Sequence, residues 1–187
     1  YLFKQAHSSY PINLACSLAI CLGLGIPFEK LTTGLADFTG VPGRFHVLSS
    51  QKQILIDDSY NANPESMREG LKTLKNLYPA GEKVIILGEM YELGTESKTE
   101  HQKLGQYLAD LKLTGSLLLV GENAKYIGEK AKTCGFNAEQ IYYFQDVEQL
   151  LSKMSETLPL YPVLYAKGSR AVQLDKIIKL LTKTEIT

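Results

Sequence analysis

Four short segments of the chain concentrate polar side chains that could bind a ligand: Asp57–Asn63, Gly88–Met90, Gly121–Asn123 and Lys167–Arg170. Carboxylates in the first segment could accept hydrogen bonds from ribose hydroxyls or help to hold a metal ion, and its asparagines can both donate and accept. The arginine that ends the fourth segment is suited to binding a carboxylate through two parallel hydrogen bonds. Brought together by the fold, the four segments would line one binding cleft.

Each polar segment follows an apolar run that reads as a buried strand. Val84–Leu87, Leu117–Val120 and Val163–Ala166 are nearly continuous apolar runs, the composition of parallel strands that helices cover on both faces. The full set of predicted strands is Phe45–Leu48, Ile54–Asp58, Val84–Leu87, Leu117–Val120, Ile141–Phe144 and Val163–Ala166. The predicted helices between them span 64–77, 98–111, 123–133, 146–157 and 171–182. This alternation predicts a doubly wound, mostly parallel, Rossmann-like α/β sheet, in which ligands bind outside the carboxyl ends of the strands.

The first two strands and the segment before them break this pattern. Phe45–Leu48 and Ile54–Asp58 are joined by a polar linker centred on residues 49–52, short enough for a hairpin, which predicts one antiparallel edge strand. Residues 11–38 read as two helices separated by a glycine-rich turn, and the turn-rich stretch 39–43 reads as a hinge. We therefore expect a division into residues 1–40 and 41–187.

Composition excludes several classes of function. Twenty basic and twenty acidic residues cancel, so no net field attracts nucleic acid or an anionic membrane. Three cysteines make no disulfide framework; Cys16 and Cys21 are expected as small core residues of a helix, and reduced thiols indicate the cytoplasm. No run approaches the roughly 20 apolar residues of a membrane span. The chain opens on Tyr1 rather than Met, and we expect it to be part of a longer protein.

The segment Asp57–Pro64 is the most informative of the four. An isolated Asp-Asp-Ser is commonly a strand-to-helix turn with capping side chains. The full octet, however, resembles the signature of the Mur ligases, and within them the branch that adds D-alanyl-D-alanine. Gly43-Arg44 resembles the Gly-Arg that opens the C-terminal domain of these enzymes, Leu87–Gly94 resembles their "LGDMLELG" stretch, and Lys167–Arg170 matches their "KGSR". With His101 at the family's distance, the resemblance covers nearly the whole chain.

The resemblance implies a ligase of peptidoglycan synthesis, and so of cell wall biogenesis, cell shape and cell division. ATP would phosphorylate the tripeptide carboxylate of UDP-MurNAc-tripeptide, and the amine of D-Ala-D-Ala would attack the acyl phosphate. The chain contains no Gly-x-x-x-x-Gly-Lys-Ser/Thr loop. The resemblance places that loop, with the Mg2+ ligands, in a central domain whose closing helices and hinge correspond to residues 1–40. Residues 41–187 would be the C-terminal domain, inactive without the N-terminal and central domains.

The same resemblance implies roles for individual residues. The side chains that would contact ATP are Asn13, Arg44, Asp58, Tyr60 and Asn61, and those that would face D-Ala-D-Ala are Asn63, Lys167, Ser169 and Arg170. The family's His-Asn before Asn13 is replaced by Ser9 and Tyr10, which puts the adenine contact on that side in question. No metal ligand and no catalytic residue is assigned to this chain. His101, in a helix start with Ser97 as its expected cap, is expected to support the site rather than to react.

Several other polar and aromatic residues are expected to have structural or solvent-exposed roles. Glu89 and Glu92 are expected in a solvated loop, Asn123 as a helix cap, and Tyr142–Phe144 in the core of a strand. Two other functions remain open at this point: a Mur-superfamily amide ligase that adds a different amino acid, and a stand-alone nucleotide-binding α/β module. A dehydrogenase half is disfavoured because no Gly-x-Gly-x-x-Gly follows the first strand.

Overall fold

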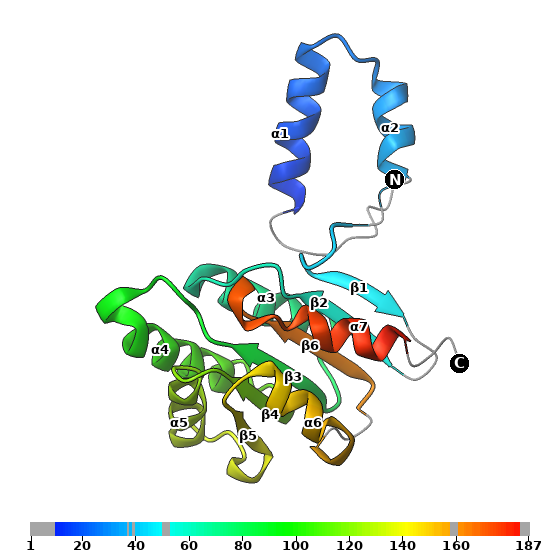
Figure 1. The fold of residues 1–187 in the computed structure, drawn as a ribbon. Coiled ribbons are helices and arrows are strands. Elements are labelled where there is room, and N and C mark those ends of the chain that lie inside the picture. The colour runs from blue at the N-terminus through cyan, green and yellow to red at the C-terminus, as the bar shows by residue number, and fades with distance from the viewer. Residues whose placement is uncertain (1–9, 37, 39, 50–52, 158–160, 184–187) are drawn as a thin grey trace. The chain divides into compact units, whose positions relative to one another are not determined.

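The computed structural model describes residues 10–36, 38, 40–49, 53–157 and 161–183, and the chain divides into two compact units, Tyr1–Val41 and Pro42–Thr187 (Figure 1). The first unit contains two helices, α1 (Tyr10–Gly23) and α2 (Phe28–Ala36), as predicted. Gly25 turns the chain between them with a positive φ of 77°. His7, Ser9 and Thr39 lie outside the described residues.

The cysteines of α1 do not lie in a core. Within this unit Cys16 is exposed and Cys21 is half-buried, so the prediction that both are core residues was wrong. Its helices expose several large apolar side chains, among them Ile12, Ile20 and Phe28. Helical periodicity gave the right element here, but two helices without a sheet between them are too few to enclose an α1 side chain on all sides.

The second unit is built on one six-stranded sheet. Its strands are β1 (His46–Ser49), β2 (Ile54–Asp58), β3 (Lys83–Gly88), β4 (Gly115–Val120), β5 (Ile141–Phe144) and β6 (Val163–Lys167). They lie in the order β1-β2-β6-β3-β4-β5; β1 pairs antiparallel with β2, and every other neighbouring pair is parallel. The predicted parallel sheet with one antiparallel edge strand is confirmed. Residues 50–52 of the hairpin linker lie outside the described residues.

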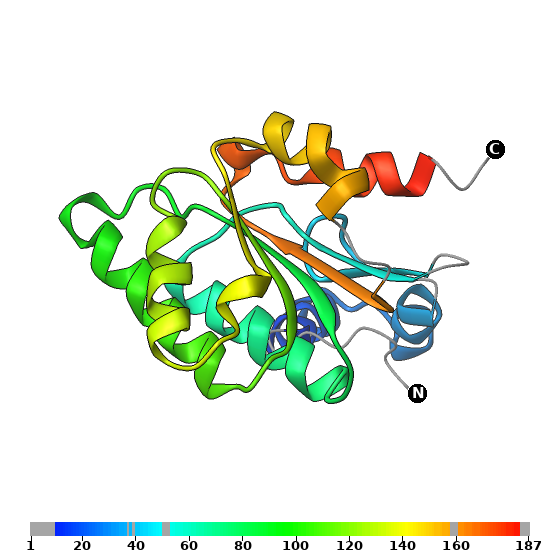
Figure 2. The same cartoon turned by 90° about the horizontal axis from the view of Figure 1, so that it is seen from below.

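Helices cover both faces of this sheet (Figure 2). One face carries α3 (Pro64–Leu77), α4 (Ser97–Asp110) and α5 (Lys125–Thr133), and the other carries α6 (Val147–Thr157) and α7 (Asp175–Lys183). Strand residues alternate between the two cores: Ile85 of β3 faces the first set of helices and Ile86 the second. A strand buried on both faces needs a continuous apolar run, which explains the composition of the three central strands.

Three helix starts differ from the prediction. Short 3-10 turns come first in two of them: η1 (Gly94–Glu96) precedes α4, and η3 (Arg170–Val172) precedes α7. Ser97 therefore begins α4 behind Glu96 and does not cap it, and α5 begins at Lys125 without a side-chain cap from Asn123. The predicted helix 171–182 begins at Asp175 because Gln173 adopts a left-handed φ of 60°. A further 3-10 turn, η2 (Ala138–Gln140), precedes β5.

Two smaller expectations can be judged on the same fold. In β5 the aromatic run is only partly core, because Phe144 is buried while Tyr143 is 49% exposed at the edge of the sheet. Among the described residues, no helix combines the length and apolar character that a membrane crossing requires.

Candidate functional site

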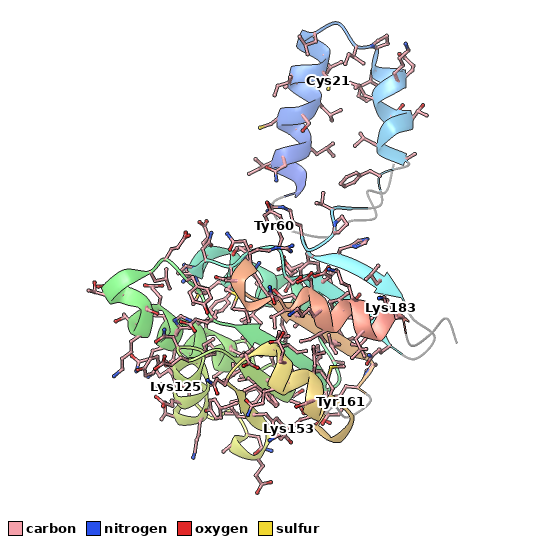
Figure 3. The ribbon with its side chains drawn as sticks, in the orientation of Figure 1. Cys21, Tyr60, Lys125, Lys153, Tyr161 and Lys183 are labelled. Carbon is pink, nitrogen blue, oxygen red and sulfur yellow. The ribbon has the colours of Figure 1, made fainter. Side chains whose placement is uncertain are left out.

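An open pocket of about 930 Å³ lies at the carboxyl edge of the sheet. Three loops line it, and they follow β2, β6 and β3, which are neighbours in the sheet. The lining residues are Tyr60, Asn61, Ala62, Asn63, Tyr91, Glu92, Leu93, Ser169, Arg170 and Ala171. Tyr60 is labelled in Figure 3 on the loop after β2. Topology thus brings together polar segments that are more than 100 positions apart in the chain.

Asp57 fastens the start of the unit to the loop after β2. Its Oδ1 accepts hydrogen bonds from the Ser59 backbone N–H (3.1 Å) and hydroxyl (2.6 Å), and its Oδ2 accepts one from the Gly43 N–H (3.1 Å). The Tyr60 N–H returns a bond of 2.9 Å to the Gly43 carbonyl. A side chain at Gly43, whose φ is 75°, would place its Cβ 3.0 Å from that of Tyr60, so this contact requires glycine.

The same fastening sets Arg44 against Tyr60. The guanidinium carbon lies 4.2 Å from the centre of the Tyr60 ring, a cation–π contact between two exposed side chains. Together they present a flat, positively charged surface beside the pocket. Such a surface suits a ligand that combines an aromatic ring with anionic groups.

Asp58 and Lys167 point into the domain and not into the pocket. Their side chains are 6% and 4% exposed, with 3.1 Å between Lys167 Nζ and Asp58 Oδ2. The Tyr165 hydroxyl donates to the same oxygen at 3.0 Å, and the Phe45 N–H donates to Oδ1 at 3.1 Å. Burial and the adjacent Asp58 carboxylate raise the pKa of Tyr165 well above its ordinary value, so its hydroxyl remains a donor.

This ion pair is bonded to the backbone of a loop that lines the pocket. Lys167 Nζ also donates to the carbonyl of Asn61 at 3.1 Å, which links the buried pair to the loop after β2. We expected Asp58 to bind a ribose and Lys167 to face a dipeptide. The structure places neither side chain in the pocket wall, because both charges are used inside the domain.

Ser169 joins the three loops. Its hydroxyl donates to the Ala62 carbonyl at 3.4 Å and accepts from the Tyr91 N–H at 2.9 Å, while its own N–H donates to the Glu89 carbonyl at 3.1 Å. Ser169 is only 4% exposed, so its main contribution to the pocket is to hold the wall together. Serine is well suited to this place because one hydroxyl serves as donor and acceptor at once.

Glu89 and Asn123 differ from the sequence prediction. Glu89 is 6% exposed rather than solvated, and the Asn123 side-chain amide donates to its Oε1 instead of capping α5. Gly121 permits this arrangement, because its φ is 106° and a Cβ there would lie 2.8 Å from Glu89 Oε2. Glu92, by contrast, is exposed in its loop, as predicted.

Asn63 both caps a helix and lines the pocket. Its Oδ1 accepts from the Ser66 N–H at 2.8 Å, its own N–H donates to the Ser66 hydroxyl at 3.1 Å, and Pro64 occupies the first turn of α3. The capping interpretation and the ligand-facing one therefore apply to the same residue.

His101, on α4, is fully buried. Its Nε2 accepts a hydrogen bond from the Met90 N–H at 3.0 Å, and its Nδ1 donates to the Ser97 carbonyl at 2.7 Å. Burial lowers the pKa of His101, and this outweighs the opposing effects of the Ser97 bond and of the Glu89 and Glu100 charges. Through the Met90 N–H, the ring contacts the loop after β3.

Comparison with known proteins identifies this arrangement. Residues 43–170 match the family described as "Mur ligase, glutamate ligase domain". The chain belongs to the Mur ligase family. It is 36% identical over 155 residues to the UDP-N-acetylmuramoyl-tripeptide–D-alanyl-D-alanine ligase of Rickettsia prowazekii. The matched region covers 83% of this chain and 33% of that enzyme.

Solved Mur ligase structures share the fold. MurF from Acinetobacter baumannii matches with a TM-score of 0.75 at 30% identity, covering 91% of this chain and 37% of that one. MurF from Thermotoga maritima, solved in complex with ADP, matches with a TM-score of 0.71 at 27% identity, covering 94% and 38%. The chain thus spans about a third of the length of the relatives it matches.

In this Mur ligase domain, the signature residues divide between the interior and the pocket. Asp57, Asp58 and Ser59 are buried and hold the loop, whereas Tyr60 and Asn61 on the same loop are exposed. In the late "KGSR" segment, the lysine and the serine are likewise buried and the final arginine is exposed. Each motif therefore supplies both the ligand-facing groups and the groups that position them.

Two features of the site lay beyond sequence reasoning. Tyr91 lines the pocket at 47% exposure; its place after a predicted strand, within the family-like segment Leu87–Gly94, gave it no individual role. Asn13, expected near adenine, is exposed on α1 in the other unit. No cluster of three or more histidine, cysteine or acidic side chains suited to a metal ion occurs within the part of the chain that the structure describes.

Proposed function

We propose that the chain is part of an ADP-forming ligase that adds D-Ala-D-Ala to UDP-MurNAc-tripeptide. The observation that carries the proposal is the pocket, whose polar residues come from three segments that resemble Mur ligase motifs, Asp57–Pro64, Leu87–Gly94 and Lys167–Arg170. The relative from Rickettsia prowazekii carries the name of this activity, which supports the same substrates. The acceptor is then a small zwitterion. Arg170 of the pocket could bind its carboxylate, and Glu92 also lines the pocket.

The proposed reaction has two steps. A tripeptide carboxylate oxygen attacks the γ-phosphorus of ATP, ADP leaves, and an acyl phosphate forms. The free dipeptide amine then attacks the acyl carbon, the C–O bond to phosphate breaks, and an amide, inorganic phosphate and a proton are released. Little covalent work falls to the protein, so positioning dominates. Arg170 would hold the dipeptide carboxylate through two parallel hydrogen bonds, and Asn63 would contact the dipeptide backbone.

The nucleotide would lie on the side of Arg44 and Tyr60. The ring of Tyr60 offers a stacking face for adenine, the guanidinium 4.2 Å above it offers a charge for phosphates, and Asn61 offers an exposed amide. Asp58 and Lys167 would act on both ligands from inside by fixing the loop that carries these groups. The ADP complex of the Thermotoga maritima relative supports ATP as co-substrate.

The remaining parts of the site would belong to other domains of the protein. Residues 1–40 would be the closing helices and hinge of the central ATPase domain, with Asn13 reaching adenine, and residues 41–187 would be the C-terminal domain. The ligands of Mg2+ would lie in the central domain, as the family resemblance implies. Dependence on ATP also favours a cytoplasmic location.

The experiment uses the full-length protein with ATP, UDP-MurNAc-tripeptide and D-Ala-D-Ala, and it measures phosphate release and the amide product. We expect both with D-Ala-D-Ala, and neither with single amino acids or from the 187-residue chain alone. A different preferred amine would replace the proposed acceptor by another one. Ligation by the isolated chain would refute the division of labour between domains.

Arg170→Ala tests the carboxylate contact within the same assay. We expect the KM for D-Ala-D-Ala to rise by about tenfold or more, the effect of losing one charge-assisted pair, with the KM for ATP unchanged. Lys179→Ala on α7 removes the same charge from an exposed surface site outside the pocket, and it should leave both values unchanged. Equal effects of the two variants would remove Arg170 from the proposed site.

A further inference from the structure

The loop of residues 89–93 forms one wall of the pocket without any regular structure of its own. Three consecutive backbone N–H groups hold it. That of Glu89 donates to the carbonyl of Val120 at 2.9 Å, as strand backbone would. The next two donate to side chains: Met90 to His101 Nε2 at 3.0 Å and Tyr91 to the Ser169 hydroxyl at 2.9 Å.

The two side-chain acceptors differ in what they can do. The Ser169 hydroxyl accepts at every pH at which the protein is folded. An imidazole nitrogen accepts only while it carries no proton. The bond of 2.7 Å from His101 Nδ1 to the Ser97 carbonyl fixes the ring and leaves Nε2 as the bare nitrogen that faces Met90.

We propose that His101 is a positioning residue of the pocket: its neutral ring, by accepting from the Met90 N–H, sets the 89–93 loop and with it Tyr91 and Glu92. The identity of the ligand rests on the proposed function, whereas the loop contact does not. Protonation turns Nε2 into a donor that faces another donor, so the bond is lost and the wall is released. The loop after β2 is bonded instead to the Lys167 ammonium and to the Ser169 hydroxyl.

The charges around His101 are those of two elements. Glu89, on the loop itself, and Glu100, on α4, both favour the protonated ring. Each is partly occupied elsewhere: Asn123 binds Glu89, and Glu100 pairs with Lys103 at 2.7 Å and with Arg68 of α3 at 3.8 Å. Burial of the ring opposes these charges and is the larger effect. In the resting state the ring is therefore neutral, and its bond to the Met90 N–H is intact.

Two substitutions separate the contact from the rest of the imidazole. In His101→Gln the side-chain oxygen can take the place of Nε2 and accept from Met90, at any pH. In His101→Asn the amide can take the place of Nδ1 and donate to Ser97, but it is too short to reach Met90. Both variants remove the titrating ring, and they are similar in polarity.

The full-length enzyme should distinguish the two variants. We expect His101→Asn to raise the KM for D-Ala-D-Ala about five- to tenfold, the effect of one lost hydrogen bond at a binding loop, with the KM for ATP unchanged. In the unaltered enzyme, we expect the KM for D-Ala-D-Ala to rise at acid pH as His101 becomes protonated. His101→Gln should have the same KM as the unaltered enzyme when the histidine is neutral, and it should not show the rise at acid pH. Equal KM values for the two variants, or a fall in kcat alone, would overturn the proposal.

A second measurement needs no variant and no substrate. Hydrogen–deuterium exchange of residues 88–93, corrected for the intrinsic effect of pH, should quicken as the pH falls through the pKa of the buried ring, which lies below the ordinary value for histidine. Exchange in β4 should not change over the same range. Unchanged protection of the loop would refute the proposed role of His101, even if neither variant folds. Lack of ligation with D-Ala-D-Ala, combined with the expected exchange, would reject the proposed acceptor and retain the role of His101.

Discussion

Removing the Lys167 charge should destabilise the domain far more than an ordinary surface substitution does. Lys167→Met keeps most of the side-chain volume but leaves the Asp58 carboxylate, 6% exposed, without its counter-ion. Breaking a buried pair in this way costs about 3–5 kcal/mol, because the remaining charge stays desolvated. The lost bond to the Asn61 carbonyl adds about 1 kcal/mol.

The cost can be followed by urea unfolding with far-UV circular dichroism, since the chain contains no tryptophan. With a slope of about 2 kcal/mol per molar urea, the combined loss of about 4–6 kcal/mol should lower the midpoint by about 2–3 M. Lys179→Met is the matched control: this lysine pairs with Asp175 at 2.7 Å, but its side chain is 68% exposed. Its loss should cost less than about 1 kcal/mol.

Two further variants make the measurement a graded one. Tyr165→Phe removes one donor from Asp58 and should cost about 1.5–3 kcal/mol. Lys167→Met combined with Asp58→Asn removes both charges and should recover part of the stability lost in Lys167→Met. A midpoint for Lys167→Met no lower than that of Lys179→Met would refute the reasoning. Such a result would mean that water reaches the pair.

Close packing at Gly70 and the titration of His101 give two more predictions. Gly70→Ala should lower the free energy of unfolding by about 1–3 kcal/mol, because its Cβ would lie 2.0 Å from the Tyr165 hydroxyl and 3.0 Å from Asp58 Oδ2. Gly34→Ala on α2 meets nothing within 4 Å and should not destabilise, which thermal unfolding of both variants would check; equal losses would contradict the close packing at Gly70. For His101 the folded pKa lies below the ordinary 6.5, so the unfolded chain binds more protons between the two values. The stability that its neutral ring contributes is therefore complete above pH 6.5 and is lost as the pH falls toward the folded pKa. In urea titrations at several pH values, His101→Gln should remove this part of the pH dependence of stability. Identical dependence of stability on pH in the two proteins would show that the ring does not titrate in this range.

Sequence alone determined the elements of the second unit and their class. Apolar runs such as Val84–Leu87, separated by amphipathic helices, are compatible with few arrangements other than a doubly wound sheet. The octet Asp57–Pro64 pointed to the family because its spacing is specific. Helix starts were less predictable, since Ser97 and Asn123 are residue types that cap helices in general and do other work here.

Tertiary structure decided which side of the wall each motif residue occupies. Alternation along a strand predicts the face of the sheet on which a side chain lies. It does not tell whether the last residue of a strand, such as Asp58 of β2 or Lys167 of β6, is paired inside the domain or faces a ligand. Asp58 and Lys167 could be assigned to the interior only when they were seen 3.1 Å apart, across 109 positions of sequence. The placement of β6 between β2 and β3 makes that meeting possible. A charge buried with its partner and a charge that waits for a ligand are the same residue type in the sequence, and only their surroundings distinguish them.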